Sequence, residues 1–135
     1  MMREQIAPAL RALGLKGSGQ SYAIPHESYW ALIGFQKSVF STAATVKFTL
    51  NLTVVSREAW SRAFEAHPWI GAKPSPNVQA RTADGEWHAR IGQLLPSRSD
   101  HWWPIDHDRP TEPVAREVIE AIRDHGLPAM YQRMT

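Results

Sequence analysis

The clearest pattern along the chain is a pair of strand-like segments, Ser28–Phe40 and Ala44–Val55, separated by a short polar break. The second segment alternates apolar and polar residues from position 46 to position 54. This period of two is typical of a strand with one face on a core and the other toward water. The first segment is apolar on both faces except at Gln36 and Lys37. The pair therefore predicts two neighbouring strands near the centre of a sheet.

Further elements flank this pair on both sides. Ser56 is a suitable N-cap, and a helix that starts there should end near His67, because the residue before a proline disfavours helical geometry. The stretch Pro68–Asp84 has no period and is the longest irregular segment. We also predict a helix over Met2–Leu15 and short strands over Ser21–Ile24, Gly85–Gly92 and His101–Ile105. A last long helix should be capped by Asp108 or Thr111 and end at Gly126, with a short further turn of helix over Leu127–Met134.

This order of elements predicts the fold class. Strands that follow one another through short turns pair in antiparallel fashion, and helices must bury their apolar stripes against such a sheet. We therefore expect an α+β fold, with a single antiparallel sheet of about five strands and helices packed on one face. A chain of 135 residues has the size of one domain, so we expect a single domain over residues 1–135.

Composition narrows the class of protein. Apolar residues make up 43% and charged residues 21%, which is typical of a globular chain. Cysteine is absent, so disulfides, thiol catalysis and thiolate metal sites are excluded, and a cytoplasmic location is the expectation. The N-terminal sequence predicts no signal peptide, and no apolar run is long enough for a membrane helix. The net charge is only +2 and the basic residues are scattered, so we expect neither a nucleic acid nor a membrane as partner.

Short motifs along nearly the whole chain carry a family resemblance. They are Gly34–Ser38, Phe48–Leu52, Arg90–Leu94 and Asp100–Trp103, together with Leu13–Lys16 and Gly126–Pro128 at the two ends. In their order and spacing they resemble the bacterial domain-of-unknown-function family 4304. The resemblance implies a small α+β domain. It supplies no activity and no catalytic or binding residues.

Four polar residues interrupt the otherwise apolar strands: Gln36, Lys37, Asn51 and Arg90. If their strands are neighbours, these side chains converge on one face and form a polar pocket for an anionic or amide-bearing group. The alternative is ordinary solvation of a sheet face with cross-strand hydrogen bonds, which we favour because the register is open.

The densest chemistry lies between His101 and Asp108. Within it, His101, Asp106, His107 and Asp108, with His88 from another strand, have the side chains of a metal site. Their spacing matches no helical metal-binding motif, so we favour an exposed turn whose acids cap the next helix. The sequence also contains no nucleophile elbow, phosphate loop or dinucleotide fingerprint. We therefore predict no metal, no cofactor and no catalytic residue.

Tryptophan is frequent, with six in the chain. Neighbours in an extended strand point to opposite faces, so one of Trp102 and Trp103 should be buried and the other partly exposed. Trp69 in the irregular stretch is a second candidate for an exposed interface anchor.

Two functional hypotheses follow. The first is a non-enzymatic binding or protein-interaction module, in one version an immunity-like protein that masks a toxin, with another protein as partner and homodimerisation left open. The second is a small ligand-binding or hydrolytic domain that uses the polar sheet face with His88 or His101. The residues proposed for binding are Gln36, Lys37, Asn51, Arg90, His101, Trp102 and Trp103.

Overall fold

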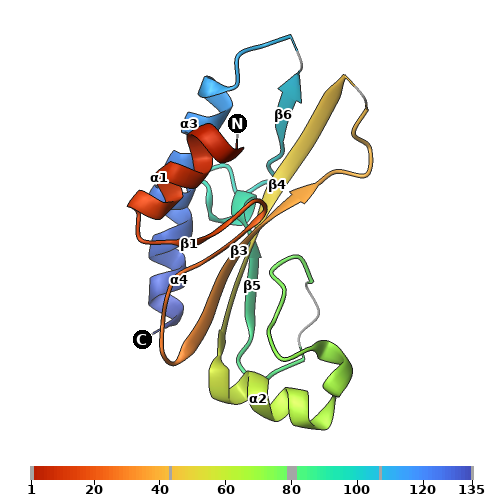
Figure 1. Ribbon diagram of the computed structural model, residues 1–135, viewed down its shortest axis with the longest axis vertical. Coiled ribbons are helices and arrows are strands. Elements are labelled where there is room, and N and C mark those ends of the chain that lie inside the picture. Colours follow the sequence, from red (N-terminus) through yellow and green to blue (C-terminus); the bar gives the residue numbers. More distant parts are fainter. Residues whose placement is uncertain (1, 43, 79–81, 107, 135) are drawn as a thin grey trace.

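A computed structural model describes residues 2–42, 44–78, 82–106 and 108–134 of the chain. Its centre is a six-stranded sheet in which every pair of strands is antiparallel (Figure 1). The order is β1-β2-β3-β4-β5, and β6 also pairs with β4. The strands are β1 (Lys16–Ser18), β2 (Ser21–Ala23), β3 (Tyr29–Lys37), β4 (Thr45–Ser56), β5 (Trp87–Arg90) and β6 (Trp103–Asp106).

The long strand β4 organises the sheet. One of its edges pairs with β3 over nine positions, from Tyr29 opposite Ser56 to Lys37 opposite Phe48. The other edge is divided between two short strands, with β5 opposite residues 51–54 and β6 opposite residues 45–48. The 3-10 turn η3 (Ile91–Leu94) follows β5 directly. The sequence prediction that this strand pair is the centre of the sheet is confirmed.

Helices cover one face of the sheet, called the helix face below. They are the π-helical turn η1 (Met2–Ile6) with α1 (Ala7–Ala12), and α3 (Glu112–Ala121) continuing through the π-helical turn η4 (Ile122–Gly126) into α4 (Leu127–Arg133). Figure 1 shows α1, α3 and α4 together on this side. The arrangement confirms the predicted α+β fold with an antiparallel sheet.

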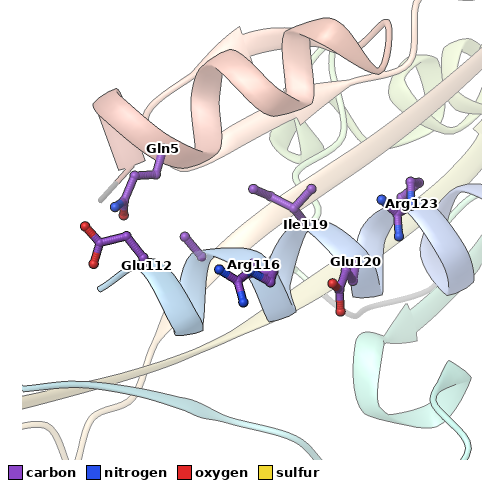
Figure 2. Close-up of a pocket in the computed structure, with 7 residues that line it drawn as sticks. Gln5, Glu112, Arg116, Ile119, Glu120 and Arg123 are labelled. Atoms are coloured by element: carbon purple, nitrogen blue, oxygen red, sulfur yellow. The ribbon is translucent and has the colours of Figure 1, made fainter. Parts of the chain in front are cut away.

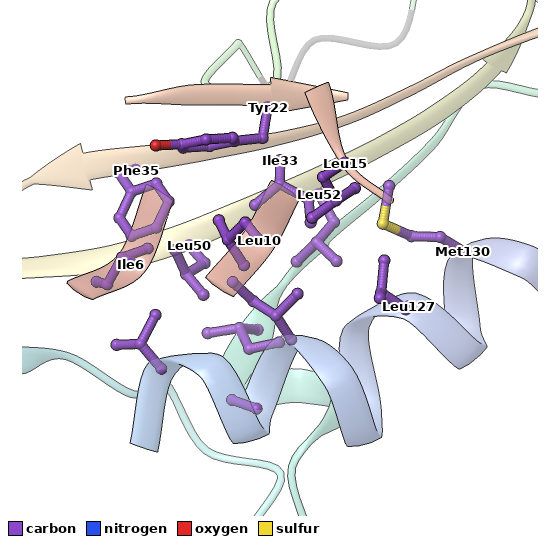
Figure 3. Close-up of a cluster of buried hydrophobic side chains, with 14 of the residues drawn as sticks. Ile6, Leu10, Leu15, Tyr22, Ile33, Phe35, Leu50, Leu52, Leu127 and Met130 are labelled. Atoms are coloured by element: carbon purple, nitrogen blue, oxygen red, sulfur yellow. The ribbon is translucent and has the colours of Figure 1, made fainter. Parts of the chain in front are cut away.

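The main core lies between these helices and the sheet (Figure 3). Alternation along β4 sends Phe48, Leu50, Leu52 and Val54 toward the helices, and none of them is more than 6% exposed. Full burial of each such side chain contributes about 1.5–3 kcal/mol. The helices supply Ile6, Leu10, Val118, Ile122 and Met130, all 0% exposed.

A second, smaller cluster forms at the far end of β4. The helix α2 (Arg57–Ala66) starts there, and the Ser56 side chain accepts a hydrogen bond from the Ala59 amide at 3.0 Å, so the predicted N-cap is confirmed. The helix ends before Pro68, as predicted, and the 3-10 turn η2 (Pro68–Ile70) follows. Trp60 and Ala63 of α2 pack with Val55, which points away from the helix face.

Two local predictions were wrong. Thr111 stands at the N-cap of α3, but its hydroxyl donates to Gln5 Oε1 at 2.9 Å instead of capping the helix. Gly126 does not end a helix, because its φ of −70° is helical and the chain runs on into α4. A Cβ at Gly126 would lie 3.2 Å from Leu52 Cδ2, so the glycine lets this helix approach the sheet closely. None of the helices in the described part of the chain has both the length and the apolar composition that crossing a bilayer requires.

Candidate binding site on the second face of the sheet

The face opposite the helices, called the second face below, carries buried polar side chains. Thr49, Asn51 and Thr53 of β4 are each 0% exposed and alternate with the core residues of the same strand. The register places Asn51 between Gly34 and Arg90, and Thr53 between Leu32 and His88. Polar groups from three strands therefore meet on a face that the segment after α2 shields from solvent.

Four side chains form a hydrogen-bonded group on this face, called the polar network below: Gln36 of β3, Asn51 of β4, Arg90 of β5 and Asn77 of the segment after α2. Asn51 Nδ2 donates to Gln36 Oε1 at 2.6 Å and to Asn77 Oδ1 at 2.9 Å. Asn51 Oδ1 accepts from Arg90 Nε at 3.3 Å, and Gln36 Oε1 also accepts from Arg90 Nη2 at 3.4 Å. Both donors and the acceptor of the buried Asn51 amide are thus used, which favours one rigid arrangement.

The outer end of the polar network reaches solvent. Arg90 Nη1 lies 3.2 Å from Asp100 Oδ2, in an ion pair whose side chains are 30% and 52% exposed. Trp102 Nε1 donates to the same carboxylate at 2.8 Å, and the Arg90 guanidinium lies 5.3 Å from the centre of the Trp102 ring. Asp100 therefore holds Arg90 and Trp102 in place, and the charge of Arg90 is already matched.

Gly34 explains why the segment after α2 packs so closely on the second face. A Cβ at this position would lie 2.6 Å from Asn77 Oδ1 and 2.7 Å from Pro76 Cγ. Such distances are shorter than any real contact of a Cβ atom, so only glycine leaves room for both groups.

A second chain of polar contacts runs beside the polar network. The His88 ring contacts Thr53 Oγ1 through Nδ1 at 2.8 Å and Glu86 Oε2 through Nε2. An ionised carboxylate only accepts, so Nε2 donates to Glu86, while the Thr53 hydroxyl can either donate to Nδ1 or accept from it. The side chains of His88 and Glu86 are 6% and 1% exposed. Thr53 therefore fixes the ring that in turn holds the carboxylate.

Glu86 and His88 line a cavity of about 300 Å³, called the Glu86 cavity below. Its walls are mainly apolar and come from α2, η2 and the segment that follows. They include Trp60, Trp69, Ile70, Pro74 and Val78. Trp60 is only 6% exposed, whereas Trp69 and Val78 are 78% and 57% exposed, so the cavity has a buried end and an apolar rim in solvent. Ligand sites usually combine mainly apolar walls with a small number of polar groups, as this cavity does.

The Thr53–His88–Glu86 chain has the residue types of a nucleophile, a base and an acid. Its geometry argues against that role. Thr53 is 0% exposed and is not among the residues that line the cavity, so a bound molecule meets His88 and Glu86 first. A nucleophile must reach the reacting atom, which the enclosed Thr53 hydroxyl does not. The arrangement can bind and orient a group, and no step of hydrolysis follows from it.

The structure brings together three of the four polar residues predicted on the strands. Gln36, Asn51 and Arg90 meet in the polar network, and Trp102 joins its outer end. Lys37 is not with them, because it alternates with Gln36 and lies exposed opposite Phe48 at the end of β3.

His101 and Trp103 lie apart from the polar network. The His101 ring packs on Trp103 at 4.6 Å between ring centres, and both line a different cavity of about 240 Å³ beside α3. Trp103 is 3% exposed and Trp102 is half-buried, so one of the pair is buried and the other partly exposed, as predicted.

The predicted His/Asp cluster is dispersed as far as it is described. His107 lies outside the described residues, and Asp106 accepts a hydrogen bond from Thr45 Oγ1 at 2.6 Å. His88 belongs to the second face, far along β4 from Thr45. Within residues 2–42, 44–78, 82–106 and 108–134, no group of three or more metal-ligating side chains is close enough to hold an ion.

A groove between the N-terminal helix and α3 differs in kind from the Glu86 cavity (Figure 2). Its volume is similar, about 310 Å³, and one side of it carries Glu112, Arg116 and Glu120 of α3 and Arg123 of η4. All four charged side chains are exposed to solvent, and Arg123 is paired with Asp124 at 2.8 Å. Because water solvates these exposed charges, they do not require a ligand, and the groove is a solvated helix surface.

Sequence reasoning missed Glu86, Thr53 and Asn77. A signal existed for Glu86, because it precedes His88 by two residues and so shares its face of an extended strand. Thr53 follows the same alternation as Asn51 but looked like a solvated threonine. Asn77 lies in a stretch without period, so only the folded chain brings it to Asn51.

The fold and the second face define an α+β domain in which a buried polar network lies beside a mainly apolar cavity. Residues 6–132 match the family model described as Domain of unknown function (DUF4304), which covers nearly the whole chain. The chain belongs to this family, as the sequence motifs predicted. Comparisons with curated proteins and with solved structures find no match.

Proposed function

We propose that this chain is a non-catalytic binding domain that receives a small chemical group in the Glu86 cavity. The observation that carries the proposal is the meeting of one buried polar pair, Glu86 and His88, with apolar walls and an exposed aromatic rim. The volume of about 300 Å³ lies at the lower limit of ligand pockets, which suits a group of side-chain size.

Support for binding rather than turnover comes from the hydrogen bonds around the cavity. The polar network joins Asn77 to Asn51 and so holds the segment that carries Pro74 and Val78, which sets the walls before a ligand arrives. Preorganised walls reduce the entropy that binding costs.

The exposed Trp69 also supports a protein as the source of the bound group, because tryptophan is frequent among interface anchors. In that version a partner's side chain enters the cavity while its surface rests on Trp69. An immunity-like protein that masks a toxin would be one such case. The absence of cysteine suits a bacterial cytoplasm, where we propose that the domain acts.

The test is a fragment titration followed by NMR on the whole chain. Small fragments of cationic, anionic and neutral character are added, and the indole N–H signals of Trp60 and Trp69 are recorded. We expect fragments of at least one class to shift both signals. Trp69→Ala should weaken this binding by about tenfold without unfolding the chain, because Trp69 is 78% exposed and removing one hot-spot aromatic costs about that much.

Phe40→Ala is the matched control, since Phe40 is an aromatic residue 87% exposed at the turn between β3 and β4. It should leave fragment binding unchanged. If no fragment shifts Trp60 and Trp69, or if fragments bind only in the groove of Figure 2, the proposed function is wrong.

A further inference from the structure

The two carboxylate oxygens of Glu86 have different surroundings. Oε2 accepts from His88 Nε2, whereas Oε1 is buried and has no hydrogen-bond partner. The Glu86 side chain is only 1% exposed, and the residue lines the cavity. A buried acceptor without a donor costs free energy, more so when it is charged. A ligand that brings a donor to Oε1 recovers that cost.

The walls around this oxygen select the kind of donor. None of the described residues that line the cavity is a lysine or an arginine, and the wall residue that contacts the Glu86 carboxylate is His88, at Oε2. Trp60 is held by its own hydrogen bond, from Nε1 to the Gly71 carbonyl oxygen at 3.0 Å. The Trp69 ring packs at a tilt of 56° against His67, with 4.6 Å between ring centres. The face of an indole ring attracts a cation, and its apolar surface packs on an alkyl chain. Trp60 and Trp69 therefore favour a ligand that carries a cation on an apolar stem.

We propose that the Glu86 cavity binds a primary alkylammonium group, with the ammonium on Glu86 Oε1 and the stem against Trp60 and Trp69. This inference rests on the proposed function and names its ligand class. It assigns Glu86 as the residue that sets specificity, His88 as its hydrogen-bond partner, and Thr53 as the residue that positions His88.

Because Oε2 already accepts a hydrogen bond from His88, Glu86 should bind an ammonium in preference to a guanidinium. A guanidinium binds a carboxylate best as a fork, with one N–H on each oxygen. His88 already uses Oε2, so only the buried Oε1 is without a hydrogen-bond partner. An ammonium is a compact cation whose donors rotate freely, and it needs only one acceptor.

An alkylammonium can come from a free amine or from a lysine side chain of a partner protein. The chemistry at Glu86 is the same for both. The two sources differ at the rim, where a lysine also brings a peptide backbone against Trp69 and Val78.

The experiment compares probes of one stem length on the full chain by NMR titration of Trp60 and Trp69. The probes are pentylammonium, pentylguanidinium, 1-pentanol and pentanoate, with N-acetyl-lysine N-methylamide as the peptide-like arm. We expect the dissociation constant of pentylammonium to be about tenfold lower than that of pentanol, because a charge-assisted hydrogen bond is the stronger one. Pentylguanidinium should bind more weakly than pentylammonium, and pentanoate should not bind.

Glu86→Gln removes the charge at nearly constant volume. Its amide offers the cavity a donor in place of an acceptor, so pentylammonium should bind about tenfold more weakly or not at all. Pentanol both donates and accepts, so its binding should persist and show that the cavity remains intact. Glu58→Gln, the same change at an exposed position of α2 with a side chain 82% exposed, is the matched control and should change nothing.

Each outcome decides a separate point. Stronger binding of pentylammonium than of pentanol to the natural chain supports the inference without any variant. Equal binding of the two, or preference for pentanoate, overturns the ammonium assignment while the proposed binding function stands. No response to any probe of this set contradicts the assignment, and the wider fragment titration then decides the proposed function. Binding of the lysine derivative at least as tight as that of pentylammonium points to a protein side chain, and weaker binding points to a free amine.

Discussion

Replacing Gly34 by alanine tests whether the close packing on the second face holds the binding site together. The added Cβ would lie 2.6 Å from Asn77 Oδ1 and 2.7 Å from Pro76 Cγ. This Cβ would lie about 0.8 Å closer to Asn77 Oδ1 than an ordinary van der Waals contact allows. The segment that carries Pro76 and Asn77 must therefore move outward, away from Asn51.

The expected cost combines three contributions. Overpacking of a tight contact costs about 1–3 kcal/mol. Loss of the Asn51–Asn77 hydrogen bond, 2.9 Å long, costs about 1 kcal/mol. Alanine is better than glycine inside a strand by roughly 0.5–1 kcal/mol, which offsets part of the loss. We expect Gly34→Ala to lower the free energy of unfolding by about 2 kcal/mol, and the Tm by about 8 °C for a chain of this size.

The measurement is urea unfolding of Gly34→Ala, Asn77→Ala and the double variant, with the natural chain as reference. Asn77→Ala removes the nearest obstructing atom, so Gly34→Ala should cost about 1 kcal/mol less in that background. The cavity walls Pro74 and Val78 belong to the same segment, so Gly34→Ala should also weaken binding of pentylammonium.

The reasoning is refuted if Gly34→Ala is within about 0.5 kcal/mol of the natural chain, the usual range of harmless surface changes. It is also refuted if the destabilisation is the same with and without the Asn77 side chain. In the first case the segment yields without loss and the second face is not a rigid wall. In the second case the contact with Asn77 is not the cause of the destabilisation.

Two further variants test buried and capping groups. Tyr22 is 1% exposed and its hydroxyl has no hydrogen-bond partner, so Tyr22→Phe should raise the free energy of unfolding by about 1 kcal/mol, unlike the control Tyr131→Phe at a residue 49% exposed. Burial raises the pKa of the Tyr22 phenol above its ordinary value of 10.0, so the unfolded chain loses that proton first. The free energy of unfolding should therefore fall as the pH rises above 10.0, and it should fall less steeply in the Tyr22→Phe variant. Equal slopes in the two chains would contradict this. Ser56→Ala should cost about 1 kcal/mol in a thermal melt by loss of the α2 cap, whereas Ser61→Ala on the exposed surface of the same helix should cost nothing.

Part of the candidate site could be predicted from the sequence. Gln36, Asn51 and Arg90 are visible as polar exceptions on apolar strands, and alternation already places His88 and Arg90 on one face. Lys37 looked equivalent to Gln36 in the sequence, but the register carries it to the exposed end of β3. Glu86 looked like the start of a strand, and its importance comes from the contact with His88 and the enclosure of Oε1.

The sequence by itself determines the elements and the fold class, because local alternation, caps and prolines act within a few residues of each other. The central strand pair, the cap at Ser56 and the end of α2 before Pro68 are of this kind. Tertiary structure alone decides the site. It divides one edge of β4 between β5 and β6, and it brings Asn77 from an irregular segment to Asn51. It also leaves one buried oxygen of Glu86, a residue that lines an apolar cavity, without a hydrogen-bond partner. Such contacts join residues far apart in the chain, and no local pattern encodes which of them meet.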